Sequence, residues 1–292
     1  MFKGTYTAIV TPFKSGEVDE PALRNLIRMQ IEAGVEGIVP VGTTGESPTL
    51  SFEEHTRVIQ LAVEYADKKL KVIAGTGANS TSEAVYLTRA AEKAGADASL
   101  LVAPYYNKPT PEGLFQHFRE IARSTKLPII LYNIPGRCGV EITLDTVKRL
   151  AESCANIVGI KEAGGNPDRV SQMALGLGGN FCILSGDDSL TLPFMAAGAC
   201  GVISVASNVI PRQLAEMVRD FAAGQLAAAQ KTHFQYFPLM RDLFIETNPG
   251  PVKAALAMLG HIQEEYRLPI VPMAAKNRDA LKATLQNCGL LK

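Results

Sequence analysis

This sequence has no excess of either charge sign and no pattern of paired cysteines. Its 29 Lys and Arg residues balance 29 Asp and Glu residues, and the two signs are interspersed. Without a basic stripe to neutralise a phosphate backbone, we expect no nucleic-acid partner. The five cysteines are odd in number, widely separated and never spaced C-x-x-C, which argues against a disulfide framework and a zinc knuckle. We interpret them as small buried side chains in a reducing compartment.

Signals for secretion or membrane insertion are also missing. Residues 1–13 contain no basic segment followed by a long apolar one, and no cleavage site of small residues. The longest uncharged stretch, residues 189–211, has the length of a membrane span, but a proline, two glycines and an asparagine interrupt it. A helix followed by a buried strand explains this stretch better. We therefore expect a cytoplasmic protein with no membrane partner.

Motifs for nucleotides and metals are weak or absent. The segment GTGANS at residues 75–80 lacks the third glycine of a dinucleotide-binding loop, and no G-x-x-x-x-G-K-[ST] motif occurs. The four histidines are isolated and none ends an expected strand, which disfavours a metal-dependent hydrolase. Asp187 and Asp188 are adjacent, but we interpret them as a helix N-cap rather than as metal ligands. We expect no cofactor and no metal.

Eight short apolar runs recur along the 292 residues, each rich in Val, Ile or Leu on both alternating faces. This pattern predicts strands that are buried on both sides, as in a parallel sheet covered by helices. The runs are residues 6–10, 37–41, 72–75, 98–103, 128–132, 157–161, 181–185 and 201–205.

Segments with helical periodicity lie between these runs, for example residues 21–32, 53–65 and 82–93. Gly34, Gly95 and Gly198 each stand where a helix ends in the left-handed conformation before a strand. Eight strand–helix units without a linker favour a closed (β/α)8 barrel, a TIM barrel, over the alternative of an open doubly wound sheet. We expect the barrel to span residues 1–223 and a C-terminal helical extension to span residues 224–292.

In such barrels the functional residues follow the carboxyl ends of the strands. Here the polar segments at these ends are GTTGES (42–47), PYYN (104–107), YNIPGRCG (132–139), KEAGG (161–165) and SGDDS (185–189). Lys161 ends an otherwise apolar run. One interpretation is a lysine that extends its ammonium to the barrel rim. The other is a desolvated neutral amine, as a nucleophile that forms an imine requires.

Two further segments offer groups that would serve such a nucleophile. Tyr132 ends the preceding run and is either a proton shuttle for carbinolamine chemistry or a core tyrosine that bonds a carbonyl. Thr43 and Thr44 lie in a glycine-bracketed loop, which is either a carboxylate-binding backbone or an ordinary turn. Ser51 and Glu54 have the spacing of a capping box.

The motifs GTTGES, YNIPGR, GIKEAGG, SGDD and GVISV, in this order and at these strand ends, resemble those of the dihydrodipicolinate synthase branch of the pyruvate-dependent class I aldolases. The resemblance covers essentially the whole chain and includes ETNPGPVKAAL at residues 246–256. It implies a lyase of diaminopimelate and lysine biosynthesis that condenses pyruvate with L-aspartate 4-semialdehyde to 4-hydroxy-tetrahydrodipicolinate. The alternatives are another pyruvate aldolase, such as an N-acetylneuraminate or keto-deoxy sugar acid lyase, and a non-catalytic amino-acid sensor on the same scaffold.

The resemblance also implies roles for individual residues. Lys161 forms the imine with pyruvate without any cofactor, and Tyr132 transfers protons that Thr43 and Tyr106 relay, with Tyr106 reaching in from a partner subunit. Thr44 binds the pyruvate carboxylate, and Gly186 and Ile203 line the pyruvate site. Arg137 binds the carboxylate of the semialdehyde, whose planar shape its guanidinium matches. The second threonine of the loop and the arginine favour the synthase over sialic-acid lyases.

Several family members bind L-lysine as an inhibitor in a cleft between subunits, and matching positions exist here. They are Ser47, Pro48, Phe52, His55, Asn79, Glu83 and Tyr105. Phe52 and Pro48 differ from the residues of well-known sensitive members, and Ser80 with Glu83 also has the spacing of a capping box. We expect L-lysine to inhibit. We also expect a homo-oligomer, a dimer of dimers, because the role of Tyr106 requires a partner subunit.

Overall fold

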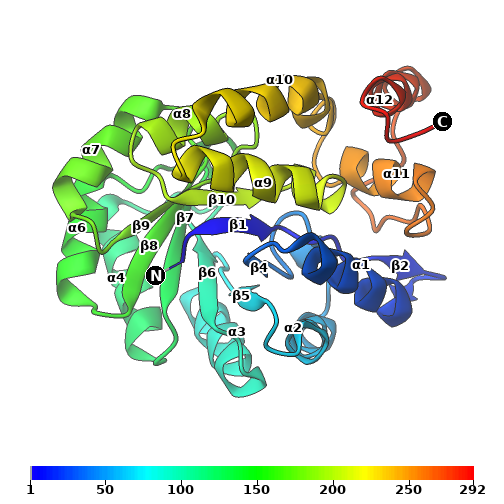
Figure 1. The fold of residues 1–292 in the computed structure, drawn as a ribbon. Coiled ribbons are helices and arrows are strands. Elements are labelled where there is room, and N and C mark those ends of the chain that lie inside the picture. Colours follow the sequence, from blue (N-terminus) through cyan, green and yellow to red (C-terminus); the bar gives the residue numbers. More distant parts are fainter. Residues whose placement is uncertain (1) are drawn as a thin grey trace.

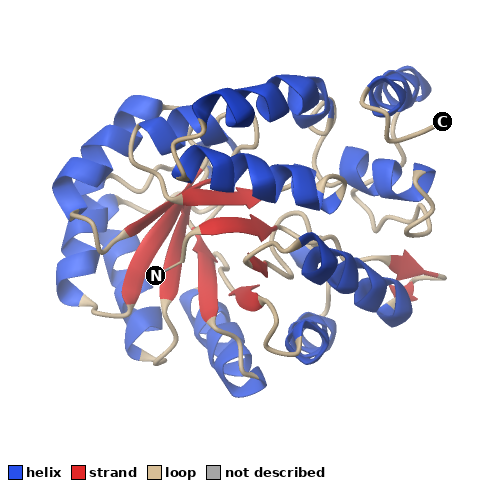
Figure 2. Cartoon of the chain, viewed as in Figure 1, coloured by secondary structure: helices blue, strands red, loops and turns tan. Residues whose placement is uncertain are grey.

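The predicted closed barrel is present in a computed structural model of the chain, which describes residues 2–292. Eight parallel strands close in the order β1-β10-β9-β8-β7-β6-β5-β4, with helices around them (Figures 1 and 2). The strands are β1 (Gly4–Thr7), β4 (Gly37–Ile38), β5 (Lys71–Gly75), β6 (Ala98–Val102), β7 (Ile129–Asn133), β8 (Ile157–Glu162), β9 (Cys182–Ser185) and β10 (Gly201–Ser204). Each overlaps one expected apolar run, so the TIM barrel is confirmed and the open sheet is excluded.

Helices that alternate with the strands form the outer layer. They are α1 (Glu20–Ala33), α2 (Phe52–Ala66), α3 (Thr81–Ala94), α4 (Pro111–Arg123), α6 (Leu144–Ser153), α7 (Pro167–Leu177), α8 (Thr191–Ala196) and α9 (Pro211–Ala222). In α1 the buried residues Leu23, Leu26, Ile27 and Gln30 recur three and four apart, which places one buried stripe against the strands; the Gln30 amide in it bonds Thr7 and the Ser207 carbonyl. Gly34 ends this helix at φ 74°, a conformation that a side chain would strain.

The barrel interior is filled by side chains from alternate strand positions. Ile130 and Tyr132 of β7 and Cys182 and Leu184 of β9 belong to one buried cluster inside the barrel. Because successive side chains of a strand point to opposite faces, Asn133, which follows Tyr132, points outward to the helices. Tyr132 lies at the carboxyl end of the barrel, where the interior opens to the loops.

The chain after α9 adds α10 (Leu226–Asp242), α11 (Gly250–Met258) and α12 (Ala275–Asn287). In Figure 1 the arrows of β1 and β10 point toward α11, so this part of the extension lies at the carboxyl ends of the strands. A hairpin of β2 (Phe13–Lys14) and β3 (Glu17–Val18) lies on the same side and was not predicted, because strands of two residues show no periodicity. The short elements α5 (Pro135–Cys138), η1 (Ser47–Thr49) and η2 (Ala206–Asn208) complete the fold.

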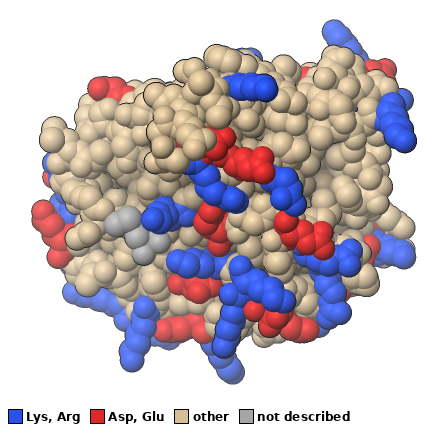
Figure 3. Space-filling view, in the orientation of Figure 1, with Lys and Arg blue, Asp and Glu red and all other residues tan. Residues whose placement is uncertain are grey.

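The surface agrees with the interspersed charges of the sequence. On the face drawn in Figure 3, Lys and Arg side chains alternate with Asp and Glu side chains, and neither sign forms a patch of its own. None of the helices within residues 2–292 combines the length and the apolar character that a membrane crossing requires. The stretch 189–211 forms α8 followed by β10, as predicted.

Candidate active site

Lys161 lies near the end of β8, beside Tyr132 of β7, in the paired register of the two strands. Its Nζ is 4.2 Å from the centre of the Tyr132 ring, and the side chain is buried. Burial lowers the pKa of Lys161 from 10.5 to about 8, although the Asp188 carboxylate opposes the shift and Arg137 adds to it. About a tenth of the amine is therefore neutral at pH 7, far more than for an exposed lysine. The desolvated-amine interpretation is the one that this geometry favours.

Tyr132 is a buried phenol next to the Lys161 amine. Burial raises the pKa of Tyr132 above its ordinary value, while Arg137 and a hydrogen bond from the Thr43 side chain oppose the rise. The phenol therefore keeps its proton at neutral pH and lies beside the Lys161 amine. That arrangement suits a group that passes a proton to and from an adduct on the amine.

Two adjoining cavities open above Lys161 and share Thr43, Tyr132 and Arg137 in their walls. The inner cavity is lined by Thr44, Lys161, Gly186 and other residues of the strand ends, and the outer cavity holds about 240 Å³. Thr43, Thr44, Tyr132, Arg137, Lys161 and Gly186 thus meet as expected. Ile203 does not line either cavity; it is fully buried in the barrel interior.

Gly186 has to be a glycine because of its approach to Lys161. A Cβ at this position would lie 3.0 Å from Lys161 Cε and 2.7 Å from the Ala163 methyl group. Its backbone N–H donates to the Glu162 carbonyl at 2.7 Å, which fixes the end of β9 against β8. The close approach leaves no room for a side chain at this position.

Asn248 was not singled out from the sequence, yet it lines the inner cavity from the extension. Its Nδ2 donates to Thr44 Oγ1 at 3.1 Å, and its carbonyl accepts from Arg137 Nη2 at 3.2 Å. Its Oδ1 is buried and has no partner within residues 2–292. Asn248 follows no strand, so a search of strand ends passes over it; its place in the ETNPGPVKAAL motif was the only signal.

Asp188 is buried at the end of β9, and the N-cap interpretation is wrong. Helix α8 begins at Thr191 with Leu190 at its N-cap position. Asp188 Oδ2 instead accepts from the backbone N–H groups of Val205 and Ala206 at 3.0 and 2.9 Å. Burial raises the pKa of this carboxyl, and hydrogen bonds from Ser204 and Ala206 oppose the shift. The side chain thus holds the loop after β10.

Tyr106 lies apart from the other predicted catalytic residues. Its side chain is 91% exposed, and its backbone has a φ of 72°, in the left-handed region. It lines neither of the two cavities. Within a single chain, therefore, the Tyr106 phenol is exposed and lies outside both cavities.

A further cavity of about 360 Å³ gathers most of the predicted effector residues. Its walls include Ser47, Pro48, Phe52, His55, Glu83 and Tyr105. Asn79 stands outside this wall and donates from Nδ2 to the Tyr105 carbonyl at 3.2 Å. Ser47, Pro48 and Tyr105 also line the outer catalytic cavity, so the two spaces adjoin.

His55, a polar residue in the wall of this cavity, already has a hydrogen-bond partner. His55 Nε2 lies 2.8 Å from the Gly75 carbonyl, and burial lowers the pKa of the ring, so the neutral imidazole donates from Nε2. The capping-box alternative for Glu83 is wrong, because the Ser80 hydroxyl bonds the Ser82 hydroxyl and caps nothing. The capping box of Ser51 and Glu54 is confirmed.

Comparisons with known proteins agree with this geometry. The family model described as "Dihydrodipicolinate synthetase family" matches residues 1–288. The 4-hydroxy-tetrahydrodipicolinate synthase of Syntrophus aciditrophicus (strain SB) is 55% identical over 291 residues, covering 100% of both chains. The solved 4-hydroxy-tetrahydrodipicolinate synthase of Methylacidiphilum fumariolicum SolV is 57% identical, with a TM-score of 0.98 over 99% of this chain and 96% of that one.

One solved relative contains a bound amino acid. It is DHDPS from Cyanidioschyzon merolae with lysine bound, which is 41% identical, with a TM-score of 0.97 over 99% of each chain. The full-length matches confirm the predicted lyase activity, that of a 4-hydroxy-tetrahydrodipicolinate synthase, over the other pyruvate aldolases and the non-catalytic sensor. The chain belongs to the dihydrodipicolinate synthetase family.

Proposed function

We propose that Lys161 carries the condensation of pyruvate with L-aspartate 4-semialdehyde as a covalent imine. The observation that supports this most is a buried amine with a lowered pKa, 4.2 Å from a phenol ring and open to a cavity. Nζ attacks the keto carbon of pyruvate, and loss of water gives the imine. Its tautomer, an enamine, attacks the aldehyde carbon through the former methyl carbon. The substrate amine then displaces Lys161 and closes the ring of 4-hydroxy-tetrahydrodipicolinate.

The surrounding residues divide the remaining work. Tyr132 donates and accepts the protons of carbinolamine formation and collapse, and Thr43 relays them. Thr44 binds the pyruvate carboxylate next to Asn248, while Gly186 lines the space for the ketone. The exposed guanidinium of Arg137, at the entrance, matches the planar carboxylate of the semialdehyde. Ile203 supports the cavity from beneath it.

Borohydride reduction in the presence of pyruvate tests this proposal. We expect a pyruvyl adduct on Lys161 and none on Lys253, which is as deeply buried but paired with Glu46. Adduct formation should rise with pH toward about 8, because the neutral amine is the nucleophile. An unmodified Lys161, or adducts spread over surface lysines, would refute the mechanism.

Arg137→Ala separates the two substrates. The variant should still form the pyruvate imine, because Arg137 is exposed and bonds the Asn248 backbone carbonyl rather than Lys161, but it should lose most semialdehyde turnover. Equal activity of the variant and the parent protein would contradict the role of Arg137. A lost imine with no loss of fold would place Arg137 at the pyruvate site instead.

We propose that L-lysine binds the effector cavity and inhibits. Glu83 faces the amino groups of such a ligand, and the shared wall of Ser47, Pro48 and Tyr105 connects this cavity to the catalytic one. A lysine-bound relative supports the proposal. A titration of the initial rate against L-lysine should show inhibition that Glu83→Gln weakens; a flat curve to millimolar effector would refute it.

We further propose a homo-oligomer, a dimer of dimers, in which the partner's copy of Tyr106 completes the proton relay. The exposed position of Tyr106 within one chain supports this. One 44% identical relative is described as a monomeric dihydrodipicolinate synthase variant, so the fold itself does not dictate assembly. Light scattering decides between monomer, dimer and tetramer, and Tyr106→Ala should lower the rate only if the protein is an oligomer.

The free cysteines support a reducing, cytoplasmic location.

A further inference from the structure

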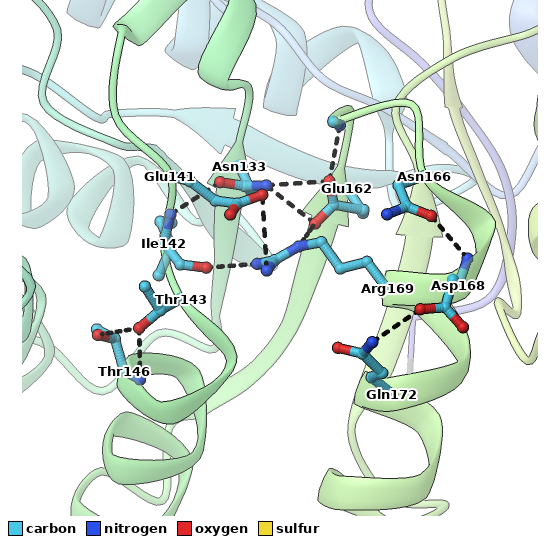
Figure 4. A network of polar contacts seen from close by, with 11 residues as sticks. Asn133, Glu141, Ile142, Thr143, Thr146, Glu162, Asn166, Asp168, Arg169 and Gln172 are labelled. Carbon is cyan, nitrogen blue, oxygen red and sulfur yellow. Dashed lines mark hydrogen bonds and ion pairs between the residues drawn. The ribbon is translucent and has the colours of Figure 1, made fainter.

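The residues that follow Lys161 and Tyr132 face away from the cavity and bond to each other. Glu162 and Asn133 are partners in the register of β8 and β7, as Lys161 and Tyr132 are one position earlier. Asn133 Nδ2 lies 3.0 Å from each carboxylate oxygen of Glu162 (Figure 4). Both side chains are fully buried. The ends of the two catalytic strands are therefore joined by side chains as well as by the backbone.

Glu162 is the centre of a larger set of contacts. Its carboxylate accepts from the Gly164 N–H at 2.7 Å and from Arg169 Nε of α7 at 2.9 Å. Its backbone carbonyl accepts from the Gly186 N–H at 2.7 Å. One residue thus connects β8 to β7, to the loop that follows, to α7 and to the end of β9. Lys161 lies between the connected elements.

The remaining polar atoms of this cluster are satisfied too. Asn133 Oδ1 accepts from the Ile142 N–H at 2.9 Å, and an Arg169 terminal nitrogen donates to the Ile142 carbonyl. Arg169 Nη1 also lies 3.6 Å from Glu141. Figure 4 shows Arg169 reaching from its helix to the strand ends. A buried carboxylate with a cationic partner and further donors has one low-energy geometry, which makes the cluster rigid.

Rigidity at this place has a chemical consequence. The imine requires the amine, the phenol and the ketone in one geometry, and a displacement of about 1 Å can cost about a hundredfold in rate. The strands end at Asn133 and Glu162, and a last backbone bond, from the Ala163 N–H to the Asn133 carbonyl at 2.9 Å, closes their pairing. The side-chain contacts act at that point.

We propose that Asn133, Glu162 and Arg169 are positioning residues that hold Lys161 against Tyr132 and Gly186 from the outer face of the barrel. The proposal rests on the proposed imine chemistry. It predicts that loss of the contact between Asn133 and Glu162 lowers the rate of imine formation. Binding of pyruvate by Thr44 on the other side of the cavity should change little.

The experiment compares Asn133→Ala with Asn156→Ala. Asn156 directly precedes β8, and its Nδ2 donates to the carbonyls of Ala122, Thr125 and Leu127, so it is an amide at the opposite end of the same strand. The measured quantities are the borohydride-quenched rate of imine formation at saturating pyruvate and the KM for pyruvate. Circular dichroism at the assay temperature verifies the fold of each variant.

We expect Asn133→Ala to lose about tenfold to a hundredfold in imine formation with a KM for pyruvate within about threefold, and Asn156→Ala to keep its rate. Glu162→Gln removes the charge at equal volume and keeps part of the bonding, so its loss should be smaller than that of Glu162→Ala. If Asn133→Ala does not fold, Glu162→Gln tests the inference in its place. A parental rate in folded Asn133→Ala and Glu162→Gln, or an equal loss in Asn156→Ala, would overturn the inference. Absence of any imine in the parent protein would instead refute the proposed function.

Discussion

Two lysines are buried within residues 2–292, and they differ in their charged partners. Lys161 and Lys253 both have Nζ 4.2 Å from the centre of an aromatic ring, that of Tyr132 and of Phe13 respectively. Burial lowers the pKa of both. Lys253 pairs directly with the buried Glu46 carboxylate, whereas no carboxylate within residues 2–292 forms an ion pair with Lys161. Burial is therefore common to both lysines, and the proposed nucleophile, Lys161, differs from Lys253 in having no paired carboxylate.

The ion pair of Lys253 joins the extension to the loop after β4. Glu46 follows the loop of Thr43 and Thr44, and Lys253 lies on α11. The second carboxylate oxygen of Glu46 accepts from the Arg267 backbone N–H at 3.2 Å. A charged pair in this position sets the extension over the barrel mouth, so that Asn248 meets Thr44.

The largest effect should follow from breaking that pair. Glu46→Ala leaves the Lys253 ammonium buried without its counter-charge, which should lower the free energy of unfolding by about 3–5 kcal/mol in urea denaturation. The double variant Glu46→Leu with Lys253→Met should recover most of the loss, since neither charge is then buried. Glu20→Ala, which breaks an exposed pair with Arg57, is the control and should cost much less, because solvent screens that pair. Equal losses in Glu46→Ala and Glu20→Ala would show that Lys253 does not depend on its buried counter-charge.

Lys161 was predictable from the sequence, and Lys253 was not. A lysine at the end of an apolar strand is a local pattern, and the alternating apolar runs also predicted all eight strands. The ion pair joins residues 207 positions apart, so no local pattern contains it. Asn248 was missed for the same reason. Asp188 was misread because its partners, Val205 and Ala206, lie just after the next strand, β10, rather than in the following helix.

Removing Lys161, the lysine without an ion pair, should raise the free energy of unfolding, whereas breaking the pair of Lys253 lowers it. At a pH where the Lys161 amine is protonated in both the folded and the unfolded protein, the lowering of its pKa from 10.5 to about 8 disfavours folding by about 3 kcal/mol. Lys161→Met should therefore raise the free energy of unfolding at pH 7 by about 1–3 kcal/mol, the lower end applying because Asp188 loses a nearby cation. Lys253→Met should lower it, because Glu46 is left alone.

The pH dependence sharpens this prediction. Between pH 8 and 10.5 the unfolded parent protein keeps a proton that the folded one has released, so the stability of the parent rises with pH. The advantage of Lys161→Met should be fully present below pH 8 and fade as the pH approaches 10.5. Urea denaturation of both proteins at pH 7 and pH 9.5 measures it. An advantage that grows with pH would show that the amine is not destabilised by burial.

The smallest effect concerns the ring beneath Lys253. The fully buried Phe13 ring has Lys253 Nζ at 4.2 Å and the Arg267 guanidinium carbon at 4.3 Å from its centre. Phe13→Leu removes the negative face that both cations contact, which should cost about 1–2 kcal/mol beyond the loss from repacking. Phe194→Leu gives the repacking loss alone, because that ring is equally buried and contacts no cation within residues 2–292. If the two variants unfold with the same loss of free energy, the Phe13 ring adds nothing to the accommodation of Lys253, and the contrast with Lys161 depends on the ion pair with Glu46.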